Sequence, residues 1–246
     1  MKAKVTGLLL ALLTSTAGAQ VGGLTNAEVI GQTSTTDPGK AVKTAQGQWV
    51  AFSMPVAEGT RSPCCWRGQW NNFREVGCSL EKQHESYGTS SDSPLTENVI
   101  AYTRITLDEV RSLIVVGEQC PVDGDGEKVT WLGSVDSTAS LNWLETVARS
   151  DHGDSLSYSA LYALALHRSK DASERLYALA GEADGELAEE AVFAISQLPG
   201  ETGTQMLLEL ARDQQKPREV RRQALFWLAN SDDDKAVAAL ADLLTR

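Results

Sequence analysis

The chain has 246 residues, of which 42% are hydrophobic, 22% charged and 6% aromatic, and this globular composition excludes collagen, wholesale disorder and a polytopic membrane protein. The formal net charge is −11, from 22 basic and 33 acidic residues, and both halves of the chain are acidic. Because neither half is basic, we expect neither nucleic acid nor an anionic membrane surface as a main partner.

Residues 1–19 have the pattern of a secretory signal peptide. Lys2 and Lys4 give a positive start, Leu8 to Leu13 form a short apolar run, and Ala17-Gly18-Ala19 is a small-x-small cleavage site. The apolar run is too short to span a bilayer as a stable helix, and later stretches are also too short. We therefore expect an exported protein, periplasmic or secreted after cleavage, without membrane insertion.

The four cysteines lie in the first half of the chain, at Cys64, Cys65, Cys78 and Cys120. An even number of cysteines in an exported protein predicts two disulfides. A bond between the neighbours Cys64 and Cys65 would close a strained ring. Two pairings stay open: 64–78 with 65–120, or 64–120 with 65–78.

Two segments precede the midpoint of the chain. Residues 20–47 are rich in Gly, Thr and Gln and are predicted to be a flexible N-terminal arm. Residues 48–138 are predicted to be a β-rich, cysteine-containing domain, with strands at 49–56, 99–106, 113–117 and 129–132. Between them, Asp123 to Glu127 is interpreted as a hairpin turn, because it stops short of a complete calcium-binding loop.

Residues 139–246 carry an internal helical repeat. Three segments align without gaps, and 15 positions separate equivalent residues in each: Leu161 from Leu176, Val192 from Leu207, and Leu225 from Leu240. Apolar residues at i, i+1, i+4 and i+5 form one helical stripe, and a second stripe follows a break. Such a helical hairpin cannot bury both faces alone, so the pattern predicts units that stack on each other.

The third unit resembles the HEAT repeat family, through Pro217, Val220-Arg221, Ala224-Leu225, Leu228 and Leu240. In that family the proline starts the first helix and the arginine bridges to the adjoining repeat, which implies an inter-repeat structural role for Arg221. Cys64-Cys65-Trp66 and Cys78-Ser79-Leu80-Glu81 resemble the front segment of secreted bacterial HEAT-repeat proteins. The resemblance implies an α+β protein: a β-rich, disulfide-stapled N-terminal domain, then a short α-α superhelical solenoid.

Two surfaces of this solenoid are candidate binding sites. The second helix of each hairpin is expected to line a concave face that binds a protein partner, with four polar side chains: Arg175, Glu209, Arg212 and Asp242. Tyr162, Phe193 and Phe226 occupy the same repeat position and are expected to pack between repeats, or else to form a ligand groove.

The sequence contains no P-loop, dinucleotide fingerprint or nucleophile elbow. We therefore expect an exported protein-binding or scaffold module without catalysis, metal or cofactor. Two alternatives are kept: a redox-active or metal-dependent enzyme that uses the cysteine-rich half, and a cell-envelope stress or signalling accessory protein.

Overall fold

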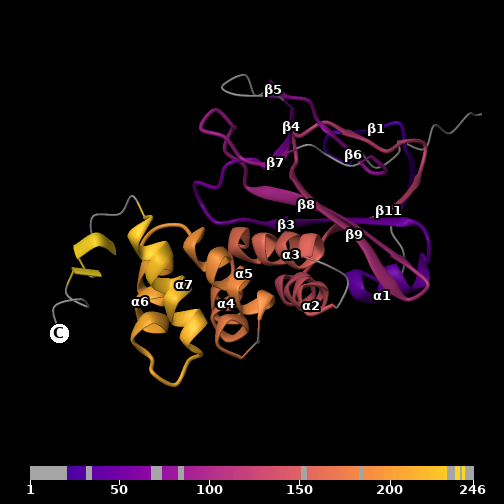
Figure 1. Cartoon of the computed structure of the whole chain (residues 1–246). Coiled ribbons are helices and arrows are strands. Elements are labelled where there is room, and N and C mark those ends of the chain that lie inside the picture. The colour runs from indigo at the N-terminus through magenta and orange to yellow at the C-terminus, as the bar shows by residue number, and fades with distance from the viewer. Residues whose placement is uncertain are drawn as a thin grey trace, which may run out of the picture.

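The structure, a computed structural model, describes residues 21–31, 35–67, 74–82, 86–150, 154–182, 185–231, 236–238 and 240–241. The expected signal peptide lies outside these residues. The fold is α+β, with sheets in the first half of the chain and helices in the second (Figure 1). Within the described ranges, no helix is both long and apolar enough to cross a membrane.

The main sheet has five strands in the order β2 (Glu28–Ile30), β11 (Lys128–Ser134), β3 (Trp49–Pro55), β8 (Asn98–Thr106) and β9 (Glu109–Gly117). β11 runs parallel to β2 and β3, whereas β3, β8 and β9 pair antiparallel. The predicted strand at 49–56 is confirmed as β3, which is buried along its length. A strand that is covered on both faces needs a nearly continuous apolar run, and this one is interrupted by Ser53 alone.

Two small three-stranded sheets complete the β half. One has the order β1 (Leu24–Thr25), β10 (Val122–Asp123), β6 (Cys78–Ser79), and the other the order β5 (Arg74–Glu75), β4 (Cys64–Arg67), β7 (Ser86–Gly88). The turn at 124–127 joins β10 to β11, which belong to different sheets. The expected hairpin at Asp123–Glu127 is therefore wrong, because each strand takes its partners from elsewhere in the chain.

The described part of residues 20–47 is folded, in contrast to the flexible arm that composition predicted. β1 pairs with β10 and β2 pairs with β11, through main-chain bonds that need no apolar periodicity. Helix α1 (Pro38–Thr44) follows, with Asp37 accepting a hydrogen bond from the Lys40 backbone N–H at its N-terminus. Buried Ala41 and Val42 attach this short helix to the core.

The second half forms two layers of helices (Figure 1). One layer has α2 (Ser137–Ala148), α4 (Lys170–Glu182) and α6 (Thr202–Arg212), and the other α3 (Asp154–Leu166), α5 (Glu186–Ser196) and α7 (Arg218–Ala229). The repeated stripes predicted these helices, and their breaks fall where expected. Gly185, at φ 68°, precedes α5, and Pro217 precedes α7.

The main sheet separates two hydrophobic cores. On one face, β3 contributes Trp49 and Ala51 to a core that contains all four cysteines. On the other face, Val50, Phe52 and Met54 pack in one continuous core that extends through the helices as far as α7. The hydrophobic core therefore continues across the change from strand to helix between β11 and α2.

The turn between α3 and α4 is joined to the end of β3 by main-chain hydrogen bonds. The Ala57 N–H donates to the Leu166 carbonyl at 2.9 Å, and the Arg168 N–H donates to the Pro55 carbonyl at 3.2 Å. Between these bonds, Val56 and His167 form an antiparallel bridge. Segments from the two halves of the chain thus share one short ladder.

His167 is 4% exposed and neutral at this join. Its Nδ1 accepts from the Ser169 N–H at 3.0 Å, so its Nε2 carries the proton and donates to the Ser140 hydroxyl oxygen, 3.1 Å away. Burial, followed by the charges of Arg168 and Arg175, lowers the pKa of His167 to about 4.

The lowered pKa predicts a loss of stability in acid. The unfolded imidazole, with a pKa of about 6.5, binds a proton before the folded one does, so the stabilisation is present above pH 6.5 and is lost as the pH falls towards 4. In urea unfolding, the stability difference between the native protein and His167→Gln should shrink by about 2–3 kcal/mol between pH 7.5 and 4.5. A difference that stays constant with pH would contradict the assignment.

The two disulfides are expected to contribute unequally to the free energy of unfolding. Cys64 pairs with Cys120, at a sequence separation of 56, and Cys65 pairs with Cys78, at a separation of 13. The entropy of the closed loops predicts a loss of about 4 kcal/mol for Cys64→Ser/Cys120→Ser and about 3 kcal/mol for Cys65→Ser/Cys78→Ser. Urea unfolding of both double variants, with the remaining disulfide verified by mass spectrometry, measures this; the reverse order would contradict the loop argument.

Candidate functional site

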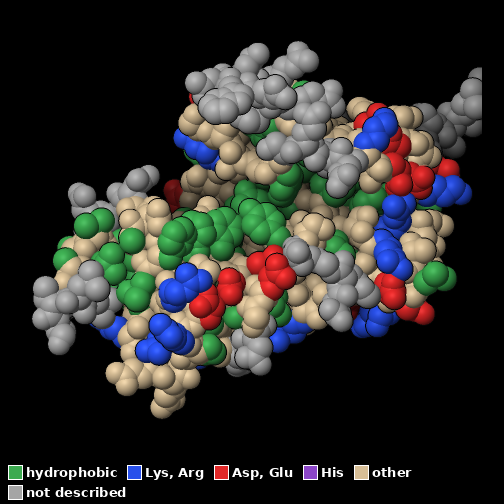
Figure 2. Space-filling view, in the orientation of Figure 1, with side chains coloured by type: hydrophobic (Ala, Val, Ile, Leu, Met, Phe, Trp, Pro, Cys, Tyr) green, Lys and Arg blue, Asp and Glu red, His purple; other side chains and the backbone are tan. Residues whose placement is uncertain are grey.

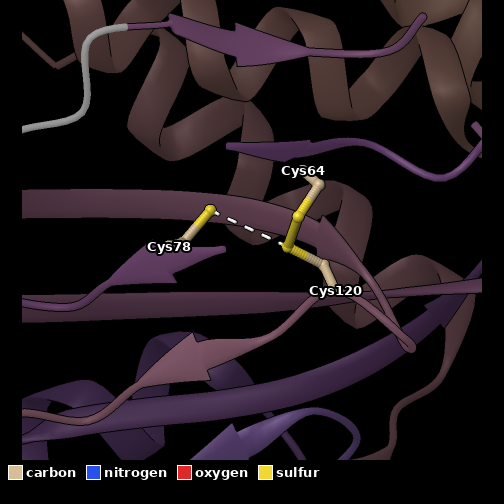
Figure 3. A group of neighbouring side chains, drawn as sticks. All are labelled: Cys64, Cys78 and Cys120. Carbon is tan, nitrogen blue, oxygen red and sulfur yellow. Dashed lines mark hydrogen bonds between the residues drawn. A yellow bond between two sulfur atoms is a disulfide. The ribbon is translucent and has the colours of Figure 1, made fainter. Parts of the chain in front are cut away.

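The four cysteines lie together between the main sheet and the small sheets. They form the disulfides 64–120 and 65–78, one of the two pairings left open by the sequence, and none is free. Cys78 Sγ lies 3.9 Å from Cys120 Sγ, so the two disulfides are in contact (Figure 3). The sulfurs of Cys64, Cys78 and Cys120 lie within 4.8 Å of one another. Every sulfur is bonded and buried, so this form has no thiolate for a metal or a nucleophilic step.

The predicted partner-binding residues on the second helices are not brought together as one free surface. Arg175 on α4 donates to Glu145 and to Asn142 of α2, both at 2.8 Å, so it joins two helices of one layer. Glu209 on α6 lines a cavity described below. Arg212 is the last residue of α6, and it is not free of interactions. Asp242 lies outside the described residues.

Arg221, expected to bridge repeats, lies on α7. Its Nε is buried and has no hydrogen-bond partner among the described residues. A neighbouring residue on the same helix joins α7 to α5: the Gln223 side-chain amide donates to Glu189 at 3.0 Å. The bridging role of Arg221 stays a prediction.

Five aromatic rings form a continuous row across the other helical layer. This aromatic row consists of Tyr162 and Tyr158 on α3, Phe193 on α5, and Trp227 and Phe226 on α7. Successive ring centroids are 6.4, 5.7, 4.8 and 5.1 Å apart along the row. Tyr158 and Phe226 are 40% and 50% exposed, and Figure 2 shows a band of hydrophobic side chains across this part of the surface.

One end of the row is anchored in the β half. Tyr87 of β7 packs edge-on against Tyr162, with centroids 5.9 Å apart, and its hydroxyl donates to the Val115 carbonyl of β9. Burial raises the pKa of Tyr87 well above its usual range and that of Tyr162 to about 12. Burial, and then the nearby charge of Glu190, also raises the pKa of Tyr158. All three phenols are therefore uncharged at neutral pH.

A groove begins where Tyr162 ends the row. Tyr162 lines a cavity of about 300 Å³ with Thr60 and Arg61, and a second cavity of about 480 Å³ shares Ala165 and Pro199 with it. We call these adjoining cavities the junction groove, because their walls come from both halves of the chain. The second cavity is lined by charged and polar side chains that include Arg168, Lys170, Ser173, Gln205 and Glu209.

The junction groove is cationic in an acidic protein. Arg61, Arg168 and Lys170 line it, against one acidic residue among its described lining, Glu209. The Arg168 guanidinium is exposed and has no ion pair among the described residues, whereas Arg61 donates to the Ser93 carbonyl at 2.8 Å. Lys170 pairs with Glu174 at 3.4 Å, but both side chains are well exposed, so solvent weakens the pair.

The sequence predicted some residues of the aromatic row but none of the basic residues of the junction groove. Tyr162 and Phe193 belong to the row as the shared repeat position indicated, but Phe193 contacts Trp227, and Phe226 lies beyond it. The i, i+4 spacing of Tyr158 and Tyr162 was a signal that could have added Tyr158. Arg61 and Arg168 lie far apart in the sequence, so no motif could have joined them.

The ion pair of Arg175 predicts a structural role for this residue. Arg175→Gln should lower the free energy of unfolding by about 1–2 kcal/mol, because it removes charged hydrogen bonds between two helices. The matched control is Arg222→Gln, which removes an exposed i, i+3 pair with Glu219 within α7 and should cost less, because solvent weakens such a pair. Equal losses in urea unfolding would show that Arg175 does not join α2 to α4.

Comparison of the chain with protein-family models, with curated proteins and with solved structures found no match. The function is therefore inferred from the aromatic row, the junction groove and the paired cysteines alone.

Proposed function

We propose that this protein is an exported binding module whose helices form a short HEAT-like stack that presents a surface to a protein partner. The observation that carries the proposal is the aromatic row. Contiguous exposed apolar side chains on a protein surface commonly mark an interaction site, and aromatic residues are enriched in such sites. The row crosses α3, α5 and α7, so the binding surface is on this layer and not on the second helices.

Export is supported by the two buried disulfides, which persist in oxidising compartments, and by the signal-like residues 1–19. A redox or metal-dependent activity has less support, because all four cysteines are paired and buried. A cell-envelope accessory role would use the same partner-binding surface.

Site-specific photocrosslinking tests the binding surface. A benzophenone amino acid would replace Phe226 or Tyr158 in cells that make the protein, and in controls it would replace Val76 or Leu107, which are 41% and 83% exposed and do not belong to the row. The row positions should give discrete cross-linked products that the controls lack. Adducts of the same kind from all four positions, or from the controls alone, would overturn the proposal.

A further inference from the structure

We propose that the aromatic row and the junction groove together bind one extended peptide segment that is apolar along the row and acidic at the groove. This inference rests on the proposed function and names the partner's chemistry. It is carried by three observations: the spacing of the rings, the continuity of the row with the groove, and the charge of the groove.

The ring spacing suits an extended chain. Two residues of a polyproline II segment advance about 6.2 Å, and two residues of a β-strand about 6.6 Å. Successive centroids in the row are 4.8 to 6.4 Å apart. Alternate side chains of an extended peptide can therefore meet successive rings, and the row accommodates roughly eight residues. A polyproline II segment binds such aromatic surfaces with little loss of conformational entropy.

Continuity follows from Tyr162, which belongs to the row and also lines the first cavity of the groove. A segment that lies along Phe226, Phe193 and Tyr158 reaches Tyr162 and then Arg61. The second cavity continues from there past Ala165 and Pro199 to Arg168 and Lys170. The two cavities adjoin, because Ala165 and Pro199 line both of them.

The positive charge of the junction groove favours acidic residues at the end of the peptide that binds there. Arg61, Arg168 and Lys170 gather in the groove although the chain has a formal net charge of −11. Arg168 is exposed and lines the second cavity, and a guanidinium group binds a carboxylate with two parallel hydrogen bonds. Glu209 also lines the second cavity and disfavours acidic residues next to it. The groove therefore favours acidic residues at one end of the peptide and not along all of it.

The probe for this proposal is a phage-displayed library of random 16-residue peptides, selected on the purified full chain with both disulfides intact. Enriched peptides should contain an apolar stretch rich in proline or aromatic residues, with acidic residues clustered at one end. An enriched peptide is then synthesised with a fluorescent label, and its affinity is measured by polarisation at low and high salt.

Two sets of variants separate the inference from the proposed function. Arg168→Gln/Lys170→Gln should weaken binding of the acidic peptide by about five- to ten-fold and reduce its salt dependence. Arg111→Gln/Lys128→Gln removes the same charge from the main sheet and should leave the affinity unchanged. Tyr158→Ala and Phe226→Ala should weaken binding of every enriched peptide.

The outcomes are distinguishable. Peptides without an acidic end, which depend on Tyr158 and Phe226 but not on Arg168 and Lys170, would overturn the acidic-peptide inference and leave the proposed function intact. Failure to enrich any peptide, or self-association of the chain through the row in sedimentation experiments, would also overturn the inference. Photocrosslinking at Phe226 decides the proposed function independently.

Discussion

The structure depends on the burial of one central strand, β3, on both of its faces. Its alternating side chains divide between two cores, with Trp49 and Ala51 on the disulfide side and Val50, Phe52 and Met54 on the helical side. Burial of Val50, Phe52 and Met54 contributes about 1.5–3 kcal/mol for each side chain through removal from water. Both layers that cover β3 are therefore needed, because loss of either would expose half of a strand that is apolar except for Ser53.

Much of the architecture could be predicted, because burial of strands and helices requires apolar residues at regular spacings in the sequence. β3 appears as a nearly continuous apolar run, and the helices appear as repeated stripes with breaks at Gly185 and Pro217. The strands of the N-terminal segment could not be predicted in this way. β1 is two residues long and β2 three, and their pairing partners lie about a hundred residues away, so they are defined by main-chain bonds and not by apolar spacing. The cysteine pairing also needed three-dimensional information, because spacing alone allowed two solutions.

The candidate site was less accessible to sequence reasoning than the fold. The repeat register identified Tyr162 and Phe193, which lie in the row, but Trp227 provides the contact that Phe226 was expected to make. Arg175 is on a second helix as expected, yet the neighbouring helix supplies its partners Glu145 and Asn142. Whether a charged side chain is free or paired depends on neighbours roughly thirty residues away, which periodicity does not specify.

The ladder at the join between the halves has a further consequence. Its hydrogen bonds link main-chain groups of Pro55, Ala57, Leu166 and Arg168, and the buried His167 fills the space behind them. The part of the groove wall at Ala57 and the part at residues 166–168 are thus joined by backbone hydrogen bonds. A molecule that binds against this wall would lose little free energy in ordering it, so the wall offers a preorganised surface to the charged and apolar groups of a ligand.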